Sequence, residues 1–152
     1  MKISNQFIFK GTCEKVWELL MDADVLKNAI PGTQKLEQTG DDTYRGVMKV
    51  GVGPVNGIFS VNIAIEDKNP PNRYTMVIDS KGNAGFVKGI AKIVLHNHEN
   101  SHTRMTYDAD LQIGGRIAIV GQRLLDTVAK SMTSKGLEAL NTSLQERLDN
   151  QV

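Results

Sequence analysis

The last part of the chain constrains the fold most, because it predicts one unusually long helix. From Arg116 to Asp149 there is no proline, and apolar residues recur mostly at every fourth position. This spacing is typical of an amphipathic helix, which would be about 50 Å long at about 1.5 Å per residue. Gly121 and Gly136 would each weaken it by about 1 kcal/mol relative to alanine, so we expect a kink or a close approach there. The apolar positions are Val120, Leu124, Val128, Met132, Leu140, Leu144 and Leu148.

The middle of the chain predicts the sheet that this helix would cover. Between Lys35 and Ile113 apolar residues recur at every second position, in segments separated by turn residues. A period of two is typical of antiparallel strands with one apolar face, so we expect a meander of about five or six strands. The predicted turns are Gly40-Asp41-Asp42, Asn69-Pro70-Pro71-Asn72 and Gly82-Asn83.

The start of the chain predicts a strand and two short helices. Ile3 to Phe9 reads as the strand, Thr12 can cap the first helix, and Asp22 or Asp24 can cap the second, which ends at Pro31. Together with the later elements, this order predicts an α+β fold. In this fold a curved antiparallel sheet of six to seven strands wraps around the long C-terminal helix.

The glycine-rich stretch VGVGPVNGIFSVNIAI, from Val50 to Ile65, spaces three glycines much as a dinucleotide-binding loop does. In such a loop the third glycine opens a helix, whereas the residues after Gly57 alternate at every second position, as in a strand. We therefore expect no phosphate site but a hairpin with a bulge or a wide loop. Pro54 would start its turn, and Asn56-Gly57 would take positive φ.

Composition excludes several function classes. With 18 basic and 17 acidic residues the net charge is +1, and aromatic residues make up 5%, so neither a basic surface nor a stacking platform for nucleic acid is expected. The single cysteine, Cys13, fits a reducing compartment, and the sequence contains no signal peptide and no membrane-spanning apolar run. We expect a cytoplasmic protein with one domain, residues 1–152.

Two clusters of polar residues are candidates for chemistry. His96 and His98 would share one face of a strand, with His102 nearby, but their polar neighbours predict a solvated hairpin tip and no third metal ligand is fixed by spacing. Asp108 and Asp110 lie on the face opposite the apolar residues of their strand and are expected in solvent. We predict no catalytic residue, no metal site and no bound cofactor.

Four segments that occur together and in order resemble one protein family. They are Ile30-Pro31-Gly32, KVGVGPVNG, GFVKG and YDADLQIGG. On these residues the chain resembles the carbon monoxide dehydrogenase G-subunit family, a branch of the START-like, or SRPBCC, helix-grip superfamily. The resemblance runs from about Asp22 to the end of the last helix. Many relatives have a cysteine after the first of these segments, where this chain has Thr33.

The resemblance implies an apolar cavity between the sheet and the C-terminal helix, and an accessory role beside molybdenum hydroxylases such as carbon monoxide dehydrogenase. We predict a non-catalytic carrier for a hydrophobic or amphipathic small molecule, such as a quinone or a lipid. It would act in the cytoplasm or peripherally at the inner face of the membrane. We expect Ile30 and Pro31 at the cavity mouth. The predicted lining is Phe59, Val61, Tyr74, Met76, Ile78, Phe86, Tyr107, Leu111, Ile117, Leu124 and Val128.

Two alternatives remain open. Related folds include cyclases and hydratases, and an enzyme would place an ionisable group such as Arg104, Asp108 or Asp110 inside the cavity beside a tyrosine. A protein-interaction or assembly module would instead have a solid core and an exposed apolar patch. The segment from Val25 to Gly32 is the candidate for docking to a partner or for transient contact with a membrane.

Overall fold

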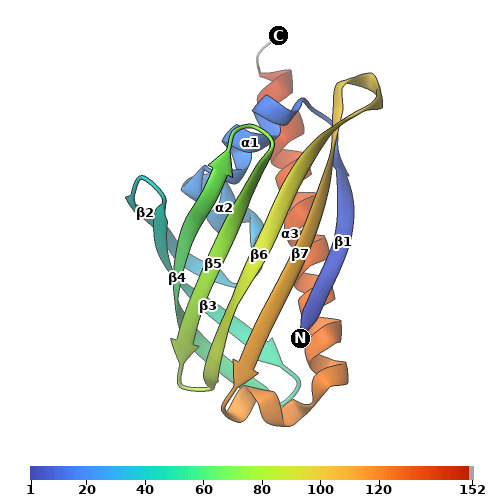
Figure 1. Cartoon of the computed structure of the whole chain (residues 1–152). Helices are drawn as coiled ribbons and strands as arrows, with labels where there is room; N and C mark the ends of the chain where they lie inside the picture. Colours follow the sequence, from blue (N-terminus) through green and yellow to red (C-terminus); the bar gives the residue numbers. More distant parts are fainter. Residues whose placement is uncertain (151–152) are drawn as a thin grey trace.

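The computed structural model describes residues 1–150. Figure 1 shows one antiparallel sheet of seven strands that curves around the C-terminal helix. The strand order is β1-β7-β6-β5-β4-β3-β2, so β2 to β7 form a meander and β1 adds to the edge at β7. The predicted α+β architecture is confirmed. The strands are β1 (Lys2–Phe9), β2 (Thr33–Gly40), β3 (Thr43–Val52), β4 (Val55–Asn69), β5 (Arg73–Gly82), β6 (Gly85–His98) and β7 (His102–Gly114).

Two short helices, α1 (Cys13–Leu20) and α2 (Ala23–Ala29), follow β1 as predicted. Thr12 caps α1, because its side chain accepts a hydrogen bond from the backbone N–H of Lys15. Asp22 caps α2 by accepting from the backbone N–H groups of Asp24 and Val25. Both caps are side chains that the sequence pattern indicates.

The C-terminal helix is shorter than its apolar pattern predicts. Residues Arg116–Val120 form a separate 3₁₀ helix, η2, and the long helix α3 spans Gln122–Asp149, about 42 Å. Gly121 separates the two with φ of +95°, a conformation that an α-helix cannot contain. Gly136 stays within α3, where a Cβ would lie 3.9 Å from Pro31 Cδ, so this glycine marks the close approach of the chain after α2. A second 3₁₀ turn, η1 (Glu99–Ser101), joins β6 to β7.

The glycine-rich stretch is a tight hairpin rather than a wide loop. Val52 and Val55 pair directly, which leaves only Gly53 and Pro54 in the turn. Gly53 takes the positive φ of +59°, whereas Gly57 lies inside β4. The expectation of a bulge or wide loop was wrong because the strand pairing continues up to the turn. A glycine followed by proline satisfies a two-residue turn with positive φ at its first position.

The two ends of the sheet differ. Figure 1 places α1 and α2 at one end, here called the short-helix end. The β3–β4 and β5–β6 turns, η2 and the first turns of α3 lie at the other end, here called the hairpin end.

Candidate functional site

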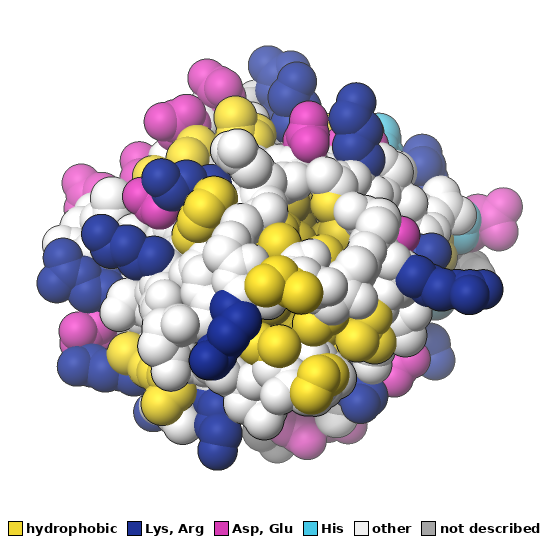
Figure 2. Space-filling view, turned by 90° about the horizontal axis from the view of Figure 1, so that it is seen from below, with side chains coloured by type: hydrophobic (Ala, Val, Ile, Leu, Met, Phe, Trp, Pro, Cys, Tyr) yellow, Lys and Arg dark blue, Asp and Glu magenta, His cyan; other side chains and the backbone are white. Residues whose placement is uncertain are grey.

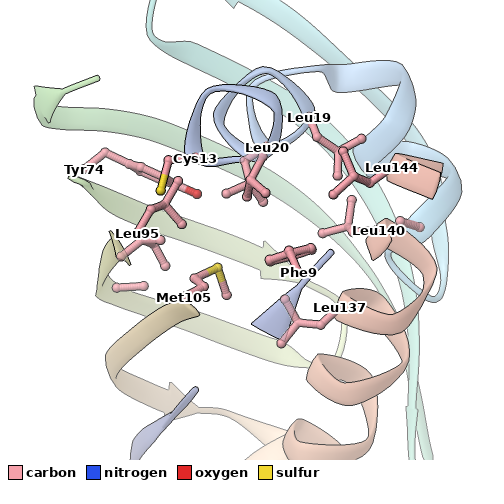
Figure 3. Packing of buried hydrophobic residues seen from close by; sticks show 14 of the residues in the cluster. Phe9, Cys13, Leu19, Leu20, Tyr74, Leu95, Met105, Leu137, Leu140 and Leu144 are labelled. Carbon is pink, nitrogen blue, oxygen red and sulfur yellow. The ribbon is translucent and has the colours of Figure 1, made fainter. Parts of the chain in front are cut away.

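The short-helix end is a solid core. Phe9, Val16 and Leu19 have no exposed surface, and Leu144 of α3 is 1% exposed. Figure 3 shows how the side chains from β1, α1, the sheet and α3 converge there. One aromatic pair, Trp17 and Tyr74, meets nearly edge to face with ring centroids 5.3 Å apart. The short helices therefore close this half of the space between sheet and α3.

The hairpin end is hollow. A cavity of about 260 Å³ lies between the sheet and the first half of α3. Figure 2, a view onto this end, shows hydrophobic side chains gathered in and around the hollow. The lining residues come from six strands, η2 and α3: Met1, Ile3, Met48, Val50, Val52, Phe59, Val61, Ile78, Ser80, Val87, Leu111, Ile113, Ile117, Leu125, Val128, Ala129, Met132 and Thr133.

The chemistry of this lining is almost entirely apolar. None of its side chains is ionisable, and the only polar side chains are the hydroxyls of Ser80 and Thr133. Three methionines, Met1, Met48 and Met132, add flexible thioethers that adapt to irregular shapes. Such a surface can desolvate an apolar molecule and has few groups that could transfer a proton.

A cavity of this size is costly when it holds nothing. At about 24 cal/mol per Å³, the rate measured for truncated cores, 260 Å³ corresponds to about 6 kcal/mol, comparable with the stability of many domains. The volume lies just below the usual range for ligand sites, about 300–1,000 Å³. It suits a small molecule, or one end of a longer molecule.

Six of the eleven residues predicted to line a cavity are brought together around this one. They share the inner face of the sheet or the facing side of η2 and α3. The six are Phe59, Val61, Ile78, Leu111, Ile117 and Val128.

Three of the other predicted residues face inward but lie at the short-helix end. Tyr74 is in the solid core, and Met76 and Tyr107 pack against it. They do not reach the cavity because α1 and α2 fill the space in front of their part of the sheet. Burial raises the pKa of Tyr74 and of Tyr107 above that of a free tyrosine, as expected for phenols held away from water.

Phe86 and Leu124 do not line the cavity, because the local geometry turns their side chains away from it. Phe86 lies on the outer face of β6, where Lys88 Nζ is 5.6 Å from the centroid of its ring, and the next residue, Val87, faces the cavity. Leu124 packs on the outside of the cavity wall beside Gly53, and Leu125 takes the inward position. In each case the prediction was one residue out of register.

The predicted mouth is also misplaced. Ile30 and Pro31 follow α2 and are absent from the cavity lining, and Pro31 packs near Gly136 in the middle of α3. The lining residues Val52, the last residue of β3, and Ile117, in η2, belong instead to elements of the hairpin end. We therefore place the mouth at the hairpin end, where Figure 2 shows a hollow surrounded by hydrophobic side chains.

Several lining residues were not predicted although their pattern is visible in the sequence. Met48 and Val50 share a strand face with Tyr44, the face that the alternation marks as apolar. Ser80 continues the inner face of β5 after Ile78, but it is polar and so falls outside a search for apolar lining. Alternation alone would have placed all three on the inner face.

The polar candidates stay outside the cavity. Asp108 and Asp110 are exposed on the outer face of β7, where the Ser4 hydroxyl donates to Asp108. His98 pairs with His102 across the β6–β7 connection, and His96 Nε2 is 3.4 Å from Thr106 Oγ1. Within residues 1–150 no group of three or more His, Cys, Asp or Glu side chains could hold a metal ion.

No helix within the described part of the chain is both long enough and apolar enough to cross a bilayer.

The sheet that wraps a long C-terminal helix, with an apolar cavity between them, defines a START-like, helix-grip domain. A START superfamily protein from Mycobacterium smegmatis has the same fold, with a TM-score of 0.71 and 12% identity over 95% of this chain and 97% of that one. The Zhui aromatase/cyclase from Streptomyces sp. R1128 is similar at a TM-score of 0.72 and 13% identity, over 97% and 95% of the two chains. At such identities the likeness shows the fold alone.

The family model for the G subunit of carbon monoxide dehydrogenase (CoxG) matches residues 6–145, and the chain belongs to this family. A conserved protein from Geobacillus kaustophilus with a known crystal structure is 31% identical in sequence to this chain over 96% of both chains, and the two structures superpose with a TM-score of 0.91. Among curated protein sequences none matches the chain significantly. The family resemblance carried by the sequence segments is thereby confirmed.

Proposed function

We propose that this chain is a non-catalytic carrier that holds a hydrophobic or amphipathic small molecule, a quinone or a lipid, in the cavity at the hairpin end. The observation that carries the proposal is the cavity itself: about 260 Å³, lined by apolar side chains and two hydroxyls. In this proposal residues 1–152 act as one ligand-binding domain. Affinity would come from buried apolar area, at about 25 cal/mol per Å² removed from water.

The ligand would enter and leave at the hairpin end. The volume is small for an entire isoprenoid or acyl lipid, so the bound part would be a ring system or a chain end, with the remainder extending through the opening. The lining residues that would contact it include six of the predicted set: Phe59, Val61, Ile78, Leu111, Ile117 and Val128.

An accessory role beside a molybdenum hydroxylase of the carbon monoxide dehydrogenase type is supported by the family to which the chain belongs. A cyclase or hydratase is the competing function, since the Zhui aromatase/cyclase shares the fold. A carrier is favoured because no lining side chain is ionisable, and acid–base chemistry in a cavity needs such a group with a tuned pKa.

Transient contact with a membrane would occur at the hairpin end rather than at Val25 to Gly32. Ile119 in η2 is 81% exposed, more than Ile58 or Ile90, the other exposed large hydrophobic residues. The charges of Asp79 and Asp110 are offset, because each lies opposite a lysine on the neighbouring strand. The acidic residue that remains to be counted at this end is Asp126, in the first turns of α3. Four basic residues of this end outnumber it: Lys49, Lys81, Arg116 and Arg123. Anionic lipid headgroups attract such a set, each cation contributing about 1 kcal/mol near the surface.

Native mass spectrometry of the purified protein, followed by organic extraction, tests the carrier. A co-purifying quinone or lipid, or a rise in the melting temperature on adding one, is the expected result. A clean unliganded mass together with no thermal shift from quinones, fatty alcohols or glycerides would contradict it. Turnover of an added polyketide or quinone with no co-reactant other than water would instead favour the cyclase or hydratase.

A further inference from the structure

Among residues 1–150 two polar residues are classed as buried, Ser80 and Thr103, and their hydroxyls differ in one respect. Thr103 is completely buried, and its hydroxyl donates to the backbone carbonyl of Gly11 at 2.8 Å. Ser80 is 6% exposed and lines the cavity, and its hydroxyl is not fully buried: within residues 1–150 the one fully buried side-chain oxygen without a partner is Thr33 Oγ1. A hydroxyl held away from bulk water is more stable with a hydrogen-bond partner than without one. Of these two residues, Ser80 is the one that lines the cavity, so a molecule bound there can reach its hydroxyl.

Ser80 lies in the wall of the cavity. On the inner face of the sheet its direct neighbours across the strands are Val61 of β4 and Val87 of β6, and all three residues line the cavity. Valine is the residue type that such a position would favour, because β-branched apolar side chains pack well in a half-buried sheet. The hydroxyl therefore introduces one polar atom into an apolar surface, directed at the space where a ligand would bind.

The second hydroxyl of the lining cannot take the same role. Thr133 donates its hydroxyl proton to the backbone carbonyl of Ala129 at 2.7 Å, so toward the cavity it has only acceptor capacity. Ser80 is thus the lining side chain with a free O–H donor, and no lining side chain carries a positive charge. One neutral donor matches a neutral oxygen acceptor. A carboxylate would lose its hydration without gaining a cationic side chain, and the ammonium group of Met1 already donates to the backbone carbonyl of Leu111 at 2.7 Å, so binding of a carboxylate is unfavourable in this apolar site.

We propose that Ser80 is the specificity-determining residue of the cavity, and that its hydroxyl donates a hydrogen bond to a carbonyl oxygen of an uncharged, otherwise apolar ligand. This inference rests on the proposed carrier function and narrows it. Uncharged ketones, quinones and esters are accepted, whereas free fatty acid anions are rejected. Tyr74 and Tyr107, the predicted lining residues that also carry a hydroxyl, are packed in or against the solid core instead.

The test compares three probes that share one ring skeleton: 2-acetylnaphthalene, 2-ethylnaphthalene and 2-naphthoate, each titrated into the protein by following probe fluorescence. The wild type should bind both neutral probes, and the carboxylate most weakly. Ser80→Ala should lower the affinity for the ketone about 2- to 12-fold, the range of one net hydrogen bond, and leave the affinity for the hydrocarbon unchanged. Tyr74→Phe, which also removes a buried hydroxyl, should change neither.

Three outcomes separate the two proposals. If neither neutral probe binds the wild type, the carrier function fails and this inference fails with it. If Ser80→Ala leaves the affinity for the ketone unchanged, or if it weakens the ketone and the hydrocarbon equally, the carrier stands and the role of Ser80 is overturned. Unfolding of the unliganded variants controls for structure: Ser80→Ala and Ser80→Val should be at least as stable as the wild type, whereas Thr103→Val should be less stable.

Discussion

Gly53 lies against Leu124, so that a Cβ on this glycine would come within 2.8 Å of Leu124 Cδ2. This contact brings the turn between β3 and β4 to the first turns of α3, where the cavity opens. The glycine is required for a second reason, its φ of +59°, a conformation that most residues adopt only with strain.

Gly53→Ala should therefore destabilise the protein by about 1–2 kcal/mol, mostly through backbone strain, since the tip of Leu124 can move aside. Gly53→Asn makes a matched control, because it adds the same Cβ against Leu124 while asparagine tolerates positive φ. Urea unfolding should show a smaller loss for Gly53→Asn. Equal losses for the two variants would mean that the contact, and not the backbone, determines the cost.

The two ends of the core should respond oppositely to added volume. Ala129 of α3 lines the cavity, so Ala129→Leu can place its extra carbons in unfilled space and should stabilise the unliganded protein by about 1 kcal/mol while preventing ligand binding. Ala91 is 5% exposed in the solid core, so Ala91→Leu should destabilise by about 1–3 kcal/mol through overpacking. Urea unfolding of both variants measures the difference. Destabilisation by Ala129→Leu as large as that by Ala91→Leu would argue against a cavity in solution.

The sequence predicted well which face of each strand is buried. It predicted less well which elements of the fold cover that face. The alternation in β5 correctly placed Tyr74, Met76 and Ile78 on the inner face. It could not tell that α1 and α2 fill the space over the first two and leave the third beside a cavity, because that depends on where the short helices dock. The family resemblance implied that a cavity exists, but it did not indicate at which end of the sheet the cavity lies.

The remaining errors arose from local geometry that a periodic pattern does not encode. The regular apolar spacing through Val120 and Leu124 concealed the break at Gly121, whose positive φ is visible only in the folded chain. Starting α3 six residues later turns Leu125 inward in place of Leu124. Ser80 was missed because a search for apolar lining excludes the one polar side chain that could direct a ligand.

The ion pair between Asp22 and Arg147 should make part of the stability depend on pH. Burial acts to raise the pKa of Asp22, but the hydrogen bond and charge of Arg147 and the backbone N–H groups of Val25 and Asp24 together outweigh it, so the pKa lies below its ordinary value of 3.8. Because the folded pKa is lowered, the stabilisation is present above about pH 4 and is lost as the pH falls through the folded pKa.

Asp22→Asn keeps a side chain that can cap α2 and removes only the charge. At pH 7 this variant should lower the free energy of unfolding by no more than about 1 kcal/mol, since the side chains of Asp22 and Arg147 are both about a third exposed or more. The loss of stability should shrink as the pH falls below 4. Arg147→Gln should give the same pH dependence, and Asp22→Ala a larger loss at every pH because the cap is lost as well. Urea unfolding at pH 7 and pH 3 measures this. A deficit for Asp22→Asn that is equal at both pH values would contradict the assignment.

Membrane contact at the hairpin end should depend on both charge and exposed apolar surface. The wild type should sediment with vesicles that contain phosphatidylglycerol and bind less to vesicles of phosphatidylcholine alone, with binding weakened as salt is raised. Lys81→Glu combined with Arg123→Glu should reduce binding to the anionic vesicles by about tenfold or more, because four units of charge are changed at the hairpin end. Ile119→Ser should weaken binding without altering its salt dependence.

The matched control for this experiment lies at the short-helix end, where Lys15→Glu combined with Lys27→Glu makes the same change in net charge. If the hairpin end faces the membrane, this pair should reduce vesicle binding much less than the pair at the mouth, because the effect of a charge decays over a Debye length of about 10 Å at 0.1 M salt. Equal reductions by both pairs would mean that net charge alone governs binding, and no binding by the wild type would remove membrane contact from the proposed function. A larger effect at the mouth would place the opening of the cavity next to the lipid, where an uncharged apolar ligand is most soluble and could enter without crossing water.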